Sequence, residues 1–336
     1  MPAALSASPL TTRALDVLRL LADGEFHSGE AMARTLGVSR GTVWNALAAI
    51  EATGVEVFRV HKRGYRLPHT IELLDSARVR QVLGPRAAAF DLAVVPIAAS
   101  TNTELLARAA QGARSGAVLA AEAQTAGRGR RGRPWVSPVG GALVFSLLWR
   151  FEQGAAWLAG LSLAVGVALV RVLRAHGAHA QLKWPNDVLV GGGKLAGILI
   201  ELQGDASGPS AVVIGVGLNL ALPAAARDAI DQPVADLAEA CAAPPGRNAL
   251  LAALLGELHT VLTAFARDGF KPFAREWEGC HAHQGRRVTA TLPDGSTLTG
   301  VARGVAEDGA LLIEAGGKSR RFISGDVSLR VSTEGR

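Results

Sequence analysis

The chain has 336 residues, of which 49% are hydrophobic and 19% are charged, with a formal net charge of +6 at pH 7. This composition excludes a disordered protein, because it supplies enough apolar side chain for two or three domain cores. The positive charge indicates an anionic partner without distinguishing nucleic acid from nucleotide. Two cysteines provide no disulfide framework, so we expect a reducing cytoplasm. The first residues do not have the pattern of a signal peptide.

Residues 1–67 predict a winged helix-turn-helix domain. Apolar spacing predicts helices over 12–22, 28–36 and 40–53, and Gly37 and Ser39 suit the tight turn between the last two. Two short strands at 55–60 and 65–67, joined by a basic turn, would form a wing that contacts phosphates. The alternative is a packing module with no DNA role. The predicted DNA-binding residues are Ser39, Arg40, Thr42, Asn45, Lys62 and Arg63.

The rest of the chain predicts a linker and two more domains. Residues 68–75 form the linker, and residues 76–283 predict an α+β domain built from hairpins and helices. Strands are expected at 92–97, 117–121, 142–150, 180–184, 188–190, 195–203 and 211–220, and helices at 101–112, 248–268 and 271–279. The uncharged stretch 153–170 is long enough to span a bilayer, but its glycines and alanines favour a buried helix. Residues 284–336 predict a small β-barrel with turns at 293–295, 308–309 and 316–317.

Residues 124–135 form an arginine loop, in which four arginines alternate with three glycines between two predicted strands. Glycine lets the backbone approach an anion, and arginine offers a planar set of donors to phosphate. The four charges repel one another, so we expect the loop to be mobile until an anionic ligand binds. Its glycine spacing also matches a dinucleotide-binding motif, but Pro134 and Pro138 prevent the helix that this motif requires. At this stage phosphate binding and a solvated basic surface remain equally good explanations.

Polar residues at the start of the helix predicted from Thr101 suggest a second binding element. Thr101 and Glu104 make a capping box, and Ser100 and Asn102 add groups able to hold a small polar headgroup. Helix capping alone would also explain this pattern.

Two of the five lysines, Lys183 and Lys194, lie on a predicted hairpin. Their charges would neutralise a reacting phosphate, and Asp187 between them offers a ligand for Mg²⁺. Two surface lysines beside an ordinary turn are the alternative. The segment 280–283, with one cysteine and two histidines, fits no standard zinc spacing, so no structural metal is expected there.

Together these segments resemble the bifunctional biotin protein ligases that also act as biotin operon repressors. The resemblance covers the winged domain, residues 100–102, the arginine loop, 183–187, 194–201 and the terminal barrel. Its most specific part is the arginine loop followed by Lys183-Trp184-Pro185-Asn186-Asp187. It implies a class II synthetase-like catalytic domain and an SH3-like C-terminal domain. The triple glycine at 191–193 and a weakly basic recognition helix depart from the family pattern.

The resemblance also implies a two-step reaction. Biotin and ATP, with Mg²⁺, would give biotinyl-5′-adenylate, and the biotinyl group would pass to a lysine of the biotin carboxyl carrier protein of acetyl-CoA carboxylase. No bound organic cofactor is expected. The implied partners are this carrier protein, operator DNA and a second copy of the chain when adenylate is bound, with no membrane. The alternatives are a biotin-sensing transcription factor without ligase activity and a lipoate or octanoate transferase.

The resemblance assigns the site residues position by position. The implied biotin-binding residues are Ser100, Thr101, Asn102, Gln124, Gly127, Arg128, Gly129, Arg130 and Lys194. The implied nucleotide-binding residues are Arg131, Arg133, Trp135, Lys183 and Asn186. Lys183, Lys194 and Arg130 would be catalytic, and Asp187 would be the metal ligand.

Overall fold

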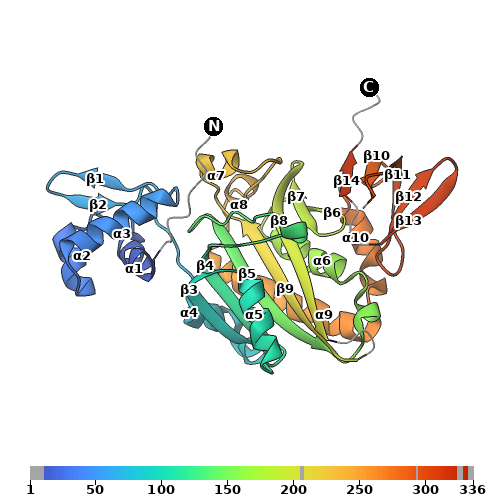
Figure 1. Cartoon of the computed structure of the whole chain (residues 1–336), viewed down its shortest axis with the longest axis horizontal. Helices are drawn as coiled ribbons and strands as arrows, with labels where there is room; N and C mark the ends of the chain where they lie inside the picture. The colour runs from blue at the N-terminus through green and yellow to red at the C-terminus, as the bar shows by residue number, and fades with distance from the viewer. Residues whose placement is uncertain (1–10, 205–207, 293, 324–327, 332–336) are drawn as a thin grey trace.

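The computed structural model describes residues 11–204, 208–292, 294–323 and 328–331. Residues 1–10 and 332–336 of the predicted outer domains, and Pro293 of a predicted turn, lie outside the described residues. The chain forms an N-terminal helical part, a large central sheet and a C-terminal group of strands (Figure 1). These parts confirm the predicted α+β fold class.

The N-terminal part contains the predicted winged helix-turn-helix. It comprises α1 (Thr12–Leu21), α2 (Gly29–Leu36), α3 (Arg40–Ala52), β1 (Phe58–Val60) and β2 (Gly64–Arg66). The Ser28 and Ser39 side chains cap α2 and α3, and Gly37 ends α2 with a left-handed φ of 64°. Strands β1 and β2 pair antiparallel as the wing, although β1 begins three residues later than expected. Apolar residues of the three helices form a separate core.

The central part is a mixed sheet of seven strands in the order β3-β4-β5-β9-β8-β7-β6. The strands are β3 (Asp91–Ala98), β4 (Ala117–Gln124), β5 (Ala142–Phe151), β6 (Gln181–Lys183), β7 (Asp187–Val190), β8 (Gly193–Gly204) and β9 (Ser210–Asn219). Strands β3 and β4 are parallel and are connected through α5 (Thr101–Ala110), and the other pairs are antiparallel. Every strand predicted for this region is therefore present.

Helices cover one face of the sheet and leave part of the other face open. The apolar helices α6 (Leu161–Ala175) and α9 (Arg247–Asp268), together with α4 (Ser76–Leu83), pack against the strands in the main core. The segments Ala155–Ala175 and Arg247–Asp268 are long and apolar enough to cross a membrane, but both are mostly buried inside the protein. This packing agrees with the predicted buried helix. Helix α5 lies on the opposite face, over β5 and β9 (Figure 1).

The remaining helices are short, and several had no counterpart in the sequence prediction. They are α7 (Ala224–Asp228), α8 (Leu237–Ala240), α10 (Ala274–Cys280) and the 3-10 turns Gly84–Ala89, Arg130–Gly132, Ala155–Leu158 and Lys271–Phe273. Helix α4 was also missed, although Asp75 supplies the N-cap that such a helix requires. Short helices have too few turns to show a clear apolar period.

The C-terminal part is an antiparallel sheet in the order β13-β12-β11-β10-β14. Its strands are β10 (Arg287–Thr291), β11 (Thr297–Val305), β12 (Leu311–Ala315), β13 (Lys318–Phe322) and β14 (Ser328–Val331). It contacts the central part at the turn after residue 307, where Gly309 O accepts a hydrogen bond of 3.1 Å from the buried indole Nε1 of Trp184. This bond ties the small sheet to the turn between β6 and β7.

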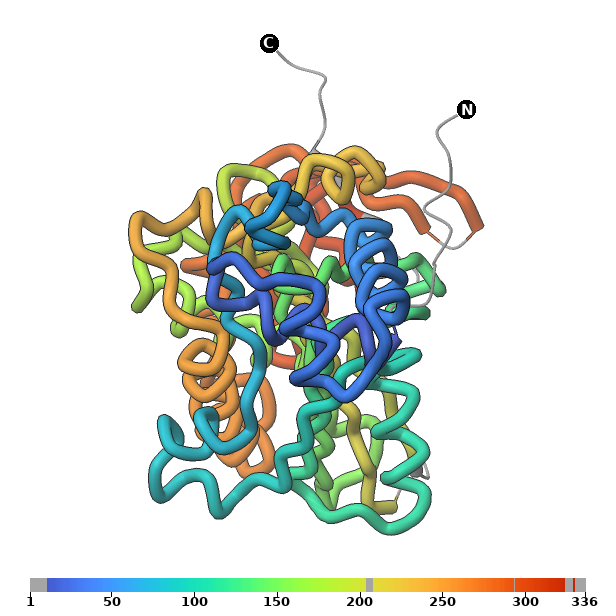
Figure 2. The backbone as a smooth tube through the Cα atoms, turned by 90° about the vertical axis from the view of Figure 1, so that its left-hand side faces the viewer, coloured from blue at the N-terminus to red at the C-terminus, as the bar shows by residue number. Residues whose placement is uncertain are grey.

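The predicted linker is bound to both of its neighbours rather than free. Ile71 N donates to Ala22 O of the winged part at 3.0 Å, and Leu74 N donates to the buried carboxylate of Glu122 on β4. Glu122 also pairs with the buried Arg247 at 2.7 Å. Figure 1 shows the winged part at one side of the central part, Figure 2 looks onto it from that side, and helix α1 contacts strand β3. The linker thus fixes the winged helix-turn-helix to the strand that carries Gln124.

Candidate active site

The predicted headgroup residues come together where α5 meets the end of β4. Ser100, Thr101 and Asn102 are all at least 95% buried. Gln124 Oε1 accepts hydrogen bonds from Thr101 N at 2.8 Å and from Thr101 Oγ1 at 3.1 Å. The residues at the start of α5 therefore do more than cap the helix, because Thr101 also orients the side chain of Gln124 from the neighbouring strand.

Asn102 lies over the middle of the sheet, at a point where three strands are in register. Ser146 of β5 pairs with Gly215 of β9, which pairs with Leu199 of β8. Ser146 Oγ lies 2.5 Å from Asn102 Oδ1, and Asn102 Nδ2 donates to Leu199 O at 3.3 Å. A Cβ at Gly215 would overlap the Asn102 side chain. Sequence reasoning missed Ser146 and Gly215; the only signal was a glycine inside a strand, which often marks a close approach.

We expect Gly215→Ala to raise the Kd for the ligand of this pocket about tenfold or more, because the added methyl group would displace Asn102. Titration of the ligand against the purified variant measures the effect. Gly279→Ala is the matched control, since no atom lies within 4 Å of a Cβ at that position. Equal affinities for both variants would contradict the close packing of Asn102 on β9.

The arginine loop folds back on itself beside these residues. Gly129 N donates to Arg133 O at 2.7 Å, and Trp135 N donates to Gly127 O at 2.9 Å. The Trp135 indole lies against Gly197 and Gly217, which face each other across β8 and β9. A side chain at Gly217 would overlap this ring. The two strand glycines thus provide the surface on which Trp135 rests.

Gly127 lies against the side chain of Gln124. A Cβ at Gly127 would lie 2.8 Å from Gln124 Nε2. The absence of a side chain therefore leaves room for the Gln124 amide. The predicted contact between Gly127 and the ligand stays a prediction.

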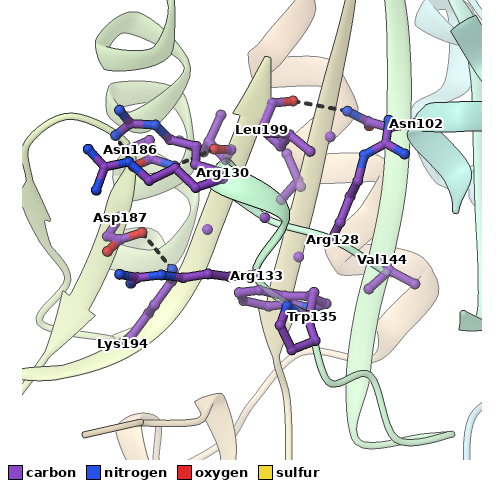
Figure 3. A pocket seen from close by; sticks show the side chains of 18 of the residues that line it. Asn102, Arg128, Arg130, Arg133, Trp135, Val144, Asn186, Asp187, Lys194 and Leu199 are labelled. Carbon is purple, nitrogen blue, oxygen red and sulfur yellow. Dashed lines mark hydrogen bonds and ion pairs between the residues drawn. The ribbon is translucent and has the colours of Figure 1, made fainter. Parts of the chain in front are cut away.

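The other end of the pocket contains the hairpin of β6, β7 and β8. Lys194 Nζ pairs with Asp187 Oδ1 at 2.7 Å and lies 5.4 Å from the Trp135 ring centroid. Arg130 Nη1 donates to Asn186 Oδ1 at 3.4 Å, which joins the arginine loop to the hairpin. Figure 3 shows Arg130, Arg133 and Lys194 pointing into the same space. The predicted phosphate-binding groups therefore converge, although Asp187 is engaged by Lys194.

One pocket contains nearly all of the predicted ligand-binding residues. Those that line it are Ser100, Thr101, Asn102, Gln124, Arg128, Gly129, Arg130, Arg131, Arg133, Trp135, Lys183, Asn186, Asp187 and Lys194. It is a cleft that is partly open to solvent. Four arginines and two lysines line it against a single carboxylate, Asp187, among the described lining residues. The pocket can accommodate a polar headgroup at one end and phosphates at the other.

Comparisons with known proteins match each part of the chain. Residues 94–219 match the biotin/lipoate A/B protein ligase family, residues 13–66 an HTH domain and residues 283–330 the biotin protein ligase C-terminal domain. The bifunctional ligase/repressor BirA of Salmonella typhimurium is 41% identical over 95% of this chain and 98% of its own length. This chain belongs to the bifunctional biotin protein ligase and repressor family.

Other relatives agree with this assignment. The BirA protein of Escherichia coli is 40% identical over 94% of this chain and 97% of its own length. A biotin protein ligase of Aquifex aeolicus, solved with biotin and ATP, superposes with a TM-score of 0.61 at 29% identity and covers 71% of this chain and 98% of its own. The catalytic fold of the family is therefore present.

A pair of buried histidines adjoins the pocket of this biotin protein ligase family member. His281 packs against Trp277 with ring centroids 4.5 Å apart, and His283 lies 5.9 Å beyond it. Burial lowers the pKa of both imidazoles to about 4, and the charge of Lys183 adds to this effect at His283. No cluster of three or more metal-ligating side chains occurs among the described residues. Both rings are therefore neutral at pH 7.

The predicted DNA-binding residues lie along α3 and the wing. Ser39 and Thr42 contact each other at 2.9 Å while Ser39 caps the helix, and Arg40 and Asn45 are exposed. Trp44 beside them is 56% exposed. On the wing, the Arg63 guanidinium stacks 4.2 Å from the Phe26 ring centroid. The recognition helix and the wing thus place exposed polar and basic groups on the winged part.

Proposed function

We propose that this protein is an ATP-dependent biotin protein ligase that also represses transcription by binding DNA. The observation that carries the ligase is the pocket itself. It joins a buried headgroup cluster, built from α5 and β4, to six cationic side chains from the arginine loop and the hairpin. A pocket that only sensed biotin would not need a cationic end of this kind.

In the first step the biotin carboxylate oxygen attacks the α-phosphorus of ATP. A phosphorus–oxygen bond forms to biotin, the bond to the β-phosphate oxygen breaks, and pyrophosphate leaves. We assign Lys183 to the α-phosphate, and Lys194 and Arg130 to the carboxylate and the new acyl phosphate. Their positive charges stabilise the negative charge that develops on the phosphate oxygens. Arg131, Arg133, Asn186 and Trp135 would hold the nucleotide.

The pocket fits Mg²⁺ as a partner of ATP rather than as a resident metal. Mg²⁺ usually binds through one or two carboxylates, phosphate oxygens and water. Asp187 offers one carboxylate, and its present partner is Lys194 at 2.7 Å. If Lys194 engaged the acyl phosphate instead, Asp187 would be available to hold the metal.

In the second step a lysine amine of the carrier protein attacks the biotinyl carbonyl carbon. An amide bond forms, the bond to the phosphate oxygen breaks, and AMP leaves with the released proton passing to solvent. Arg128 and Arg130 would position the mixed anhydride, and the closed loop would exclude water from it.

Transfer of labelled biotin to a purified carrier domain, with ATP and Mg²⁺, tests the ligase. We expect labelling by the wild type and much weaker labelling by Arg130→Ala. Binding of biotin without any labelling would instead favour a biotin-sensing transcription factor.

For the second activity we infer that α3 enters the major groove and that the wing contacts phosphates. Exposed Arg40 and Asn45 would contact the DNA from α3, and Lys62 and Arg63 would contact it from the wing. Two copies of the chain, joined when adenylate orders the arginine loop, would read a two-fold operator. Gel filtration with and without biotin and ATP tests this dimer, and an unchanged elution volume would count against it. We assign the protein to the cytoplasm, where its carrier protein and operator would be found.

We expect Lys62→Asn to weaken binding to all DNA sequences alike and to reduce the salt dependence, the slope of log K against log salt, by about 1. Lys62 lies at the exposed tip of the wing with a φ of 62°, a conformation that asparagine tolerates. The substitution therefore removes charge without straining the turn. Titration of operator and unrelated DNA at several salt concentrations measures it, with the exposed Lys318→Asn as control. An unchanged slope would exclude phosphate contact at Lys62.

A further inference from the structure

Glu201 of β8 has no role in the reaction described so far, yet its carboxylate joins the headgroup cluster to the arginine loop. Its Oε2 accepts a hydrogen bond of 2.8 Å from Asn102 Nδ2, and its Oε1 accepts one of 2.7 Å from Arg128 Nη2. Arg128 Nη1 in turn donates to Thr103 Oγ1 at 2.8 Å. Each carboxylate oxygen of Glu201 therefore binds one predicted biotin-binding residue.

The hydrogen bonds of Asn102 define what this residue can offer a ligand. The side-chain amide has two N–H donors, and these go to Glu201 Oε2 and to Leu199 O. Its oxygen receives one hydrogen bond, from Ser146 Oγ at 2.5 Å. Because an amide oxygen has two lone pairs, one acceptor position remains. Asn102 can therefore accept from a ligand but has no N–H left to donate.

Glu201 and the Leu199 carbonyl together prevent the opposite orientation. Rotating the Asn102 amide by half a turn would place its oxygen against the Glu201 carboxylate and the Leu199 carbonyl, with no proton between these acceptors. The cost of such unsatisfied buried groups strongly disfavours the rotated state. With a neutral residue in place of Glu201, only the Leu199 carbonyl, at 3.3 Å, would have to oppose the rotated state.

We propose that Glu201 is a positioning residue that fixes the Asn102 amide so that its oxygen receives a ureido N–H of the substrate headgroup. This inference rests on the proposed function and deepens it by naming the ligand group that is recognised. Through its second oxygen, Glu201 also holds Arg128 of the arginine loop beside the same headgroup. The pocket thus selects a headgroup that has an N–H donor facing the fixed Asn102 oxygen.

The test compares substrates as well as variants. The KM and kcat of adenylate formation are measured by pyrophosphate release with biotin and with its two cyclic carbamate analogues, in which one or the other ureido N–H is replaced by oxygen. Wild type is compared with Glu201→Gln, which keeps the shape and removes the fixed charge. The control is Glu276→Gln, which makes the same change at a carboxylate outside the pocket that pairs with Arg171 at 2.5 Å.

We expect Glu201→Gln to raise the KM for biotin about tenfold to a hundredfold, with a smaller change in kcat. For one carbamate analogue the wild-type KM is already high, and the same substitution should change it little. The ratio of the KM for the analogue to the KM for biotin does not depend on the fraction of folded enzyme. Partial unfolding therefore cannot produce this result. An equal loss with biotin and both analogues, or values equal to those of Glu276→Gln, would overturn the role of Glu201. A wild type that releases no pyrophosphate would overturn the proposed function itself.

Discussion

Replacing Lys194 with alanine is expected to lower the rate of adenylate formation about 10²–10³-fold, the typical effect of removing one preorganised group that stabilises developing charge. Lys194 Nζ lies at the end of the pocket to which we assign the phosphates, and its side chain is only 18% exposed. Its field is therefore weakly screened by water, and its loss leaves the charge on the acyl phosphate less well compensated. A single-turnover measurement of pyrophosphate formation gives this rate, because the later release of products does not limit it.

Two further variants identify the origin of this loss. Lys271→Ala removes the same charge from an exposed lysine that pairs with Glu307 at 3.0 Å, and should leave the rate unchanged. In Lys194→Ala the Asp187 carboxylate loses its partner, so the double variant Lys194→Ala with Asp187→Asn is also required. Recovery of the rate in the double variant would show that the orphaned Asp187 caused the defect, which would contradict the assigned role of Lys194.

Breaking the buried ion pair between Arg247 and Glu122 is expected to reduce the free energy of unfolding by about 3–5 kcal/mol. The two side chains are 7% and 3% exposed, and their atoms approach to 2.7 Å. Arg247→Met keeps most of the volume and removes the charge, so Glu122 is left buried with only the Leu74 N–H as its partner from the linker. Urea denaturation followed by tryptophan fluorescence measures the change.

Arg303→Met provides the comparison on the surface. Arg303 pairs with Glu314 at 2.7 Å, but both side chains are about half exposed, so its loss should cost about 0–1 kcal/mol. The double variant Arg247→Met with Glu122→Leu should lose less than Arg247→Met alone, because no unpaired charge remains in the core. A double variant less stable than both single variants would contradict this explanation.

The features predicted correctly from the sequence are those that local spacing determines. Ser28, Gly37 and Ser39 mark helix ends through their own backbone conformations and hydrogen bonds. The order of helix, turn and helix could therefore be predicted from the sequence. The strands of the central sheet were likewise recognisable as apolar runs between turns. The bounds of the three domains and the roles of the individual site residues stay predictions.

The features that were missed depend on contacts between distant parts of the chain. Ser146, Leu199 and Gly215 come from three strands and meet only because of the pairing register of β5, β9 and β8. The segment 68–75 has the composition of a linker, and its attachment depends on Glu122 and Arg247, which lie far away in the sequence. Apart from Gly215, a glycine inside a strand, no local pattern identifies these partners, because each is an ordinary residue within its own segment.

The bond from Trp184 to Gly309 affects how the protein can be divided or recombined. The Trp184 indole is almost completely buried beneath the C-terminal sheet, and it directly follows Lys183 in the turn that leads to Asn186 and Asp187. A Cβ at Gly309 would also lie 2.7 Å from Gly160 Cα, beside the start of α6. The last domain is therefore not an interchangeable appendage. A chimera carrying a relative's C-terminal domain would keep Trp184, and the turn that follows Lys183, in place only if the donor also had a residue without a side chain at this position.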